Sequence, residues 1–377
     1  MGGSSTDSLR VALSRWVLPP LFLRGITFGD WLRLLRENGF RVDRRYCVRA
    51  LTTTAVSVGN SAVGWWERRK YDSRLERVRV EAPVFILGHY RSGTTHCHNL
   101  LALDPRLSAP NLAQVLGPHT FLSTGALLGK VWGSLAPRTR SLDNVRLNAS
   151  VPLEDEIALV PLTLRSPYLA MSFPGNGERY AAYATLRGMP ADQLDQWKRA
   201  FVHFAKKLTL KYENRLVLKS PPHTGRIRLL LEMFPDARFV HIHRNPYAVF
   251  QSSCRSMGVF HSAVALQRWD LRGLDEHVLN RYRELYDAFY EQRGLIPEGR
   301  LHEVAFEDLE EQPLEELRKL YEALELPAFS EVEPRMRAYL EGLTGYRKNR
   351  FPELSESQRA AVAREWKRSF EEWGYPV

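Results

Sequence analysis

The chain has 377 residues, of which 44% are hydrophobic and 25% charged, as in an ordinary globular protein with a large core. The formal net charge of +10 favours anionic ligands, but the basic residues are spread among acidic ones, which argues against nucleic acid as a partner. The three cysteines, Cys47, Cys97 and Cys254, form no C-x-x-C pair. We therefore expect no disulfide framework, no metal site and a reducing, cytoplasmic compartment.

The first eighty residues are predicted to form a helical extension. Apolar residues at helical spacing follow Gly29 and Asp30, and a second helical stretch is expected around residues 44–66. The charged run at residues 67–74 is expected to be a solvated connection. The apolar segment at residues 16–24 is too short to span a bilayer. It could dock on a membrane surface and make the protein membrane-associated, although a buried arm is the favoured interpretation.

The most informative segment is PVFILGHYRSGTTH at residues 83–96. It reads as a buried strand, a turn bounded by glycines and a helix start that carries hydroxyls, which together form a cradle for phosphate. The pattern G-x-x-x-x-G-K-[ST] fits from Gly88 to Gly93 and Thr95, but Thr94 replaces the lysine that serves the β/γ-phosphates of a triphosphate. The loop is therefore predicted to hold a single 5′-phosphate with another charged group beside it.

Further strand–loop–helix patterns follow this segment. Strands are expected at residues 215–219 and 238–242, a helix at 226–234 and another helix from Pro246, and residues 301–309 could supply a further strand and a turn. This alternation predicts an α/β fold with a parallel sheet covered by helices on both faces. Polar or basic side chains follow three of the strands, where such sheets bind ligands: Arg91 with Ser92, Lys219 with Ser220, and Arg244.

Two separate motifs carry a resemblance to a known family. The run R-S-G-T-T at residues 91–95 resembles the 5′-phosphosulfate loop of the sulfotransferases, and Arg244 and Ser252 resemble the segment that holds the 3′-phosphate of their donor. The chain is thus similar to the P-loop-type sulfotransferases that use 3′-phosphoadenosine 5′-phosphosulfate (PAPS), in the broad bacterial-like branch related to the tyrosylprotein sulfotransferases. The resemblance covers residues 81–377, which we expect to form the PAPS-binding domain after a helical extension at 1–80.

The resemblance implies roles for individual residues. The phosphosulfate group would be held by Arg91, Ser92, Gly93, Thr94 and Thr95, and the 3′-phosphate by Arg244 and Ser252. Arg347 and Lys348 loosely resemble the late basic element that closes over the nucleotide. Lys219 and Arg91 are the candidates for stabilising the charge that develops on the leaving group. No metal is expected, because basic side chains can serve sulfuryl transfer.

The general base is sought among carboxylates after the first loop, where Glu154-Asp155-Glu156 forms the leading cluster. Residues two apart do not share a helix face, so only one of the two glutamates can face the donor. Glu154, which lies nearer the helix start, is the first choice and Glu156 the second. Acidic residues at a helix start are also expected from the helix dipole alone, and His119 and His98 compete for the role. Four aromatic residues could line an acceptor pocket or belong to the core: Tyr168, Phe173, Tyr180 and Tyr183.

The function expected from these features is sulfuryl transfer from PAPS to a hydroxyl of a lipid, glycan, peptide or small molecule. Two alternatives stay open at this point. One is a P-loop kinase of a small metabolite, against which the strand ending in His241-Ile242-His243 argues, because it lacks an aspartate to hold magnesium. The other is a nucleotide-binding module without catalysis.

Overall fold

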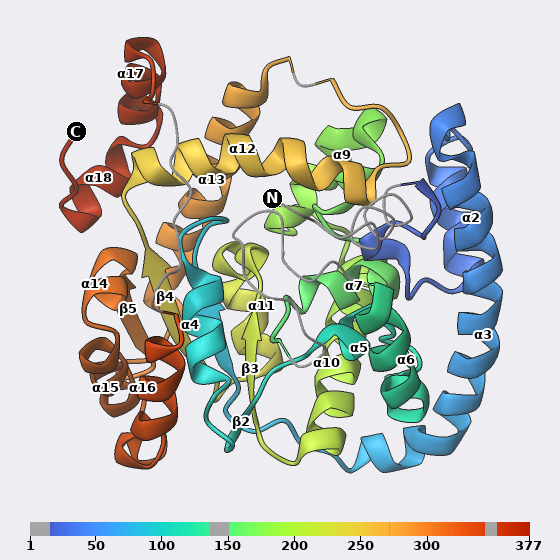
Figure 1. Ribbon diagram of the computed structural model, residues 1–377, viewed down its shortest axis with the longest axis horizontal. Coiled ribbons are helices and arrows are strands. Elements are labelled where there is room, and N and C mark those ends of the chain that lie inside the picture. Colours follow the sequence, from blue (N-terminus) through green and yellow to red (C-terminus); the bar gives the residue numbers. More distant parts are fainter. Residues whose placement is uncertain (1–15, 136–150, 271, 344–352) are drawn as a thin grey trace. The chain divides into compact units, whose positions relative to one another are not determined.

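The computed structural model describes residues 16–135, 151–270, 272–343 and 353–377 (Figure 1). Two compact units are present, and each is built from several stretches of the chain. The first unit comprises Met1–Arg79, Pro110–Glu213 and Met257–Leu271, and the second comprises Val80–Ala109, Asn214–Ser256 and Arg272–Val377. The expected boundary between residues 80 and 81 stays a prediction.

The second unit is built on a parallel sheet of five strands in the order β2-β3-β1-β4-β5. The strands are β1 Val84–Leu87, β2 Leu107–Ser108, β3 Arg215–Lys219, β4 Arg238–His243 and β5 Leu301–Ala305. In the register, Ile86 of β1 lies beside Lys219 of β3 and Val240 of β4. The predicted strands are therefore confirmed, whereas the short edge strand β2 was not expected.

Helices cover both faces of this sheet. Because side chains alternate along a strand, Val84, Ile86 and Val240 join one core with α4 (Thr94–Leu101), α15 (Pro313–Ala323) and α16 (Glu333–Glu341). On the other face Phe85 packs against Phe234, next to α11 (Ile227–Met233), and His241 stacks on Phe289 of α13 (Leu274–Gln292). The expected α/β fold with flanking helices is thus confirmed.

The second unit contains further short helices. They are η5 Pro221–Gly225, η6 Arg293–Leu295, α14 Phe306–Glu311, η7 Phe329–Glu331, α17 Glu356–Glu365 and α18 Lys367–Trp373. The helix α12 (Pro246–Val264) begins in this unit and ends in the first one. As predicted, a proline occupies its first position, where the missing N–H costs nothing.

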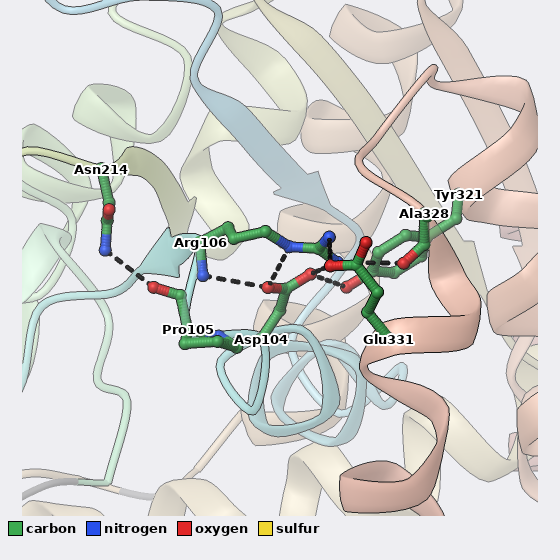
Figure 2. A network of polar contacts seen from close by, with 7 residues as sticks. All are labelled: Asp104, Pro105, Arg106, Asn214, Tyr321, Ala328 and Glu331. Carbon is green, nitrogen blue, oxygen red and sulfur yellow. Dashed lines mark hydrogen bonds and ion pairs between the residues drawn. The ribbon is translucent and has the colours of Figure 1, made fainter.

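A polar network fixes the turn that returns the chain from α4 to β2 (Figure 2). The fully buried Asp104 accepts hydrogen bonds from the Arg106 guanidinium at 2.9 and 2.8 Å, from the Arg106 N–H at 2.9 Å and from the Tyr321 hydroxyl at 3.0 Å. Arg106 also pairs with Glu331 at 2.7 Å. Burial raises the pKa of the Asp104 carboxyl, but the bonds from Arg106 and Tyr321 outweigh it and leave that pKa below its ordinary value.

The first unit is helical in its described part. Its elements are η1 Leu21–Leu23, α2 Phe28–Glu37, η2 Arg44–Tyr46, α3 Cys47–Glu76, α5 Leu112–Leu116, α6 Phe121–Leu135, α7 Glu156–Thr163, α8 Leu169–Ser172, η3 Pro174–Asn176, α9 Gly177–Ala181, η4 Ala182–Ala184 and α10 Ala191–Tyr212. The core-facing residues of α10, Trp197, Phe201, Phe204 and Leu208, recur at helical spacing. The predicted helical N-terminal extension is confirmed.

The charged run at residues 67–74 is not a connection, so that expectation was wrong. It continues α3 to Glu76, in keeping with the high helix propensity of glutamate, arginine and lysine. Glu67 is buried and pairs with Lys207 of α10 at 2.6 Å, which ties this part of α3 to the unit. Among the helices of the described ranges, none is long and apolar enough to cross a membrane.

Candidate active site

The loop after β1 makes a turn that requires glycine. Gly88 has a φ of +142°, and a Cβ there would lie 2.5 Å from the carbonyl oxygen of Ile242. The hydroxyl of Thr224, in η5, accepts from the Gly88 N–H at 2.7 Å and lies 3.2 Å from the Gly88 carbonyl oxygen, to which it donates. Thr224 was not anticipated from the sequence, although it follows the predicted strand exit at Lys219 closely.

Arg91 joins the two motifs that the sequence suggested. Its φ of +72° lies in the left-handed region, an unusual conformation for arginine that marks functional loops. Its Nε donates to the Oγ of Ser252 at 2.8 Å, and its carbonyl oxygen accepts from Nη1 of Arg244 at 3.1 Å. The structure therefore brings the predicted 5′ and 3′ phosphate-binding segments into direct contact, although 153 residues separate Arg91 from Arg244.

The residues that follow β5 contact both of these segments. The Arg244 guanidinium lies 4.5 Å from the centre of the Phe306 ring, at a distance typical of a cation–π contact. The same ring fills the space next to Gly93, where a Cβ would overlap it. The neighbouring Glu307 accepts from the Asn245 N–H at 3.0 Å. Phe306 was missed in the sequence, because an aromatic residue after a strand has no motif of its own.

The helix α4 begins at this loop with Gly93 as its N-cap, and no side chain caps its first N–H groups. A helix start of this kind favours an anionic group, and Thr94 and Thr95 add hydroxyls to it. Lys219, at the end of β3 and only 2% exposed, donates to the Oγ1 of Thr95 at 3.3 Å. Arg91 in the loop and Lys219 thus provide two cations near the helix start, in keeping with an anionic ligand.

The carboxylate cluster occupies the start of α7 in the first unit. Glu156 is the first residue of α7, Asp155 its N-cap residue, and Glu154 precedes both. Asp155 makes no capping bond through its side chain, so simple capping does not account for this acid. Asp155 and Glu156 are fully buried, and Glu154 accepts a short hydrogen bond from the Tyr168 hydroxyl. The role of Glu154 and Glu156 as base stays a prediction.

The two competing histidines differ in their surroundings. Burial, with Lys207 and Arg68 nearby, lowers the pKa of His119 to about 3, so its ring is neutral at pH 7. A base with so low a pKa takes up a proton less readily than an ordinary histidine does. His98 is fully buried on α4, and its Nε2 lies 3.4 Å from the Val217 carbonyl oxygen of the sheet.

The aromatic residues proposed for an acceptor pocket have the burial of core residues. Tyr168, Phe173 and Tyr180 are buried, whereas Tyr183 is half-buried. The Tyr180 hydroxyl accepts from Asn38 at 2.7 Å. Their pocket role stays a prediction. Arg347 and Lys348 lie outside the described residues, and among the described residues no cluster of three or more His, Cys, Asp or Glu could hold a metal ion.

Comparisons with known proteins identify the family of this chain. The model of the sulfotransferase family matches residues 83–331. The omega-hydroxy-beta-dihydromenaquinone-9 sulfotransferase Stf3 of Mycobacterium bovis is 36% identical over 366 residues, which are 96% of this chain and 94% of that protein, and the same protein of Mycobacterium tuberculosis matches equally.

Two solved structures share the fold. Sulfotransferase STF9 from Mycobacterium avium superimposes with a TM-score of 0.67 at 20% identity, over 94% of this chain and 98% of that one. Sulfotransferase STF1 from Mycobacterium tuberculosis gives 0.59 at 19% identity, over 96% and 93%. The family match and the extended identity decide between the three functions considered above. The chain belongs to the sulfotransferase family and is an enzyme that transfers a sulfuryl group from PAPS to an acceptor hydroxyl.

Proposed function

We propose that the acceptor is the terminal hydroxyl of a long isoprenoid lipid, such as an ω-hydroxylated quinone. The observation that carries this proposal is the 36% identity, over nearly the whole of both chains, to a sulfotransferase named for an omega-hydroxy-dihydromenaquinone. The free thiols of Cys47, Cys97 and Cys254 support a reducing, cytoplasmic compartment as the place of reaction.

We assign the donor to the loop at residues 91–95 with Arg244 and Ser252. Burial of Ser92, Thr94 and Ser252 supports this assignment, because these hydroxyls are held in place before any ligand arrives. Arg244 would pair with the 3′-phosphate, which ATP lacks, and would thereby select the donor against ATP. Arg347 and Lys348 are retained as further donor contacts on the resemblance alone.

The reaction breaks the S–O bond to the 5′-phosphate and forms a new S–O bond to the acceptor oxygen. The products are a sulfate monoester and adenosine 3′,5′-bisphosphate, and the acceptor proton passes to the base. Lys219 and Arg91 are assigned to stabilise the negative charge that grows on the 5′-phosphate oxygen. The burial of Lys219 supports this role, since a cation shielded from water interacts more strongly with that charge.

We keep Glu154 as the proposed base and Glu156 as the alternative. The test compares Glu154→Gln with Tyr168→Phe. The first keeps an amide oxygen that can accept from the Tyr168 hydroxyl but removes the basic carboxylate, whereas the second removes only the hydrogen bond. We expect Glu154→Gln to abolish turnover while Tyr168→Phe loses much less. Equal losses in the two variants would make the carboxylate structural, and an active Glu154→Gln beside an inactive His119→Ala would assign the base to His119.

The acceptor is tested with donor labelled in its sulfuryl group and a panel of hydroxyl compounds. An ω-hydroxylated menaquinone and a long isoprenoid alcohol represent lipids, and a simple phenol, an amino sugar and a tyrosine peptide represent the other classes. We expect label in the lipids and kcat/KM at least tenfold higher for them. Preferred transfer to the phenol, sugar or peptide would refute the lipid acceptor and leave the sulfotransferase activity intact.

A further inference from the structure

The helix α3 is long (Figure 1), and its polar and apolar faces are reversed. Its buried positions include Arg49, Thr53, Ser57 and Glu67, and one buried leucine lies near its end, Leu75. A surface helix normally turns apolar residues to the core and polar ones to water. In α3 the polar stripe faces its own unit, and the apolar stripe faces outward.

The polar groups on the inward face of α3 form hydrogen bonds within the unit, and these bonds fix the orientation of the helix. The Arg49 guanidinium donates to the carbonyl oxygens of Leu18, Ala263 and Ala265 at 3.1, 2.6 and 3.1 Å. Asn60 donates to those of Arg24 and Ile26 at 2.8 and 2.9 Å. Rotation of α3 would leave these buried groups unpaired, which is costly.

The outward stripe recurs at spacings of three and four residues, as expected for one helix face. It is made of Val48, Leu51, Ala55, Val58, Ala62, Trp65 and Trp66. All seven are exposed, with values of 70% for Leu51, 53% for Val58 and 56% for Trp65. From Val48 to Trp66 the stripe is about 27 Å long, at 1.5 Å per residue. A continuous exposed apolar surface of this length marks an interaction site.

The exposed charges that flank the stripe most closely are basic. No acidic residue occurs from residue 44 to residue 66, and exposed cations lie at both ends: Arg44, Arg45, Arg68, Arg69 and Lys70. Arg69 lies 4.1 Å from the Trp65 ring centre and Lys70 lies 4.9 Å from that of Trp66. Asp72 and Glu76 follow on the last turns, beyond the stripe. Tryptophans beside basic residues are typical of the membrane–water interface.

We propose that α3 lies on an anionic lipid bilayer through this stripe, with the basic residues at its ends against lipid phosphates. The charges favour lipid over a second copy of the chain. Pairing α3 with itself, in either direction, would bring the cations at its ends together. The segment at residues 16–24, the earlier candidate, has its Phe22 and Leu23 buried, so α3 offers the larger apolar surface.

This inference adds to the proposed lipid acceptor and is tested without it. The full chain is mixed with sedimentable vesicles of phosphatidylcholine containing phosphatidylglycerol, and with vesicles of phosphatidylcholine alone. We expect binding to the anionic vesicles that weakens as salt is added. Two double variants are compared with the wild type: Leu51→Gln with Val58→Gln, and Arg69→Gln with Lys70→Gln. Each should weaken binding to the anionic vesicles by roughly tenfold or more, from the free energy that each interfacial group contributes to binding.

The matched control is Leu295→Gln with Leu343→Gln, which alters two exposed apolar residues of the second unit and should leave binding unchanged. Thermal unfolding of each variant checks that the substitutions at these exposed positions leave the fold intact. Equal binding by the α3 variants and the wild type would overturn the inference, as would the absence of binding by the wild type. So would a dimer, by sedimentation, that the Leu51 and Val58 changes convert to a monomer, because a second copy would then cover the stripe.

Discussion

Substitution of Gly93 by alanine tests whether the ring of Phe306 shapes the donor loop. Gly93 has a φ of +95°, and its missing Cβ leaves the space that the ring occupies. An alanine in a left-handed conformation costs about 1–2 kcal/mol. Crowding in a packed region costs about 1–3 kcal/mol more. If the loop conformation that binds the nucleotide carries the whole cost of about 2–5 kcal/mol, the affinity for the nucleotide falls at least about 30-fold, since 1.4 kcal/mol corresponds to a factor of ten.

The assay is calorimetric titration with adenosine 3′,5′-bisphosphate, together with thermal unfolding. Gly299→Ala is the matched control, because Gly299 has a φ of +74° and no atom within 4 Å of its virtual Cβ. That variant isolates the backbone cost, and its nucleotide affinity should stay normal. Gly93→Ala should lose affinity in addition to any loss of stability.

A double-mutant cycle with Phe306→Ala separates the overlap from the backbone cost. Phe306→Ala alone removes the ring under Arg244, worth about 0.5–2 kcal/mol for a cation over an aromatic face. In the double variant the overlap is gone, so the combined loss should be smaller than the sum by about 1–3 kcal/mol. Additive losses would show that the ring does not constrain the loop, and normal nucleotide binding by Gly93→Ala would refute the reasoning altogether.

Three further changes have separate readouts. Lys219→Met should lower kcat by about 10²-fold or more, as for loss of one transition-state donor, with nucleotide affinity nearly unchanged; loss of affinity alone would contradict its role. Arg244→Ala should weaken nucleotide binding more than kcat, and Ser252→Ala should do so more mildly, because their contacts are made before and during the reaction; intact affinity in Arg244→Ala would contradict the 3′-phosphate assignment. Asp104→Asn should cost about 1–3 kcal/mol of unfolding free energy at pH 7, as for the loss of hydrogen bonds to a buried charged group, because Arg106 is partly exposed and keeps Glu331 as a partner. Because the folded pKa of Asp104 is lowered, its contribution is full above the ordinary value of 3.8 and is lost as the pH falls through the folded pKa. Denaturant titrations at pH 7 and pH 3 should therefore differ less for Asp104→Asn than for the wild type, and an equal difference would contradict the linkage.

The sheet could be predicted from the sequence because its strands are short, apolar on both faces and bounded by turn residues. Val84–Leu87 is followed in its loop by Arg91 and Ser92, and Arg215–Lys219 ends at a lysine, so strand direction places these residues at one edge. The contacts of Arg91 with Ser252 and of Lys219 with Thr95 follow from that placement. Motif spacing and sheet topology together predicted that these segments meet, and their role in donor binding stays a prediction.

Other features depend on tertiary contacts that leave no local pattern. The run at residues 67–74 looks like a solvated linker, since seven of its eight residues are polar or charged. Only the buried partner of Glu67, Lys207, shows why a charged helix is held there. The reversed polarity of α3 was missed for the same reason. Periodicity locates an apolar face, but it does not tell whether that face meets the core or the outside.

The general base could not be identified from sequence motifs. The donor loop is recognised because backbone geometry fixes glycines and hydroxyls at set positions, whereas a base needs only one proton-accepting atom near the acceptor. Any of several elements can supply that atom, so sequence order carries little information about it. Glu154 and Glu156 lie in the helical first unit, and the donor-side residues lie around the sheet of the second. Kinetics of matched variants, such as Glu154→Gln beside Tyr168→Phe, are therefore needed to identify it, because they compare proton acceptance with hydrogen bonding at one position.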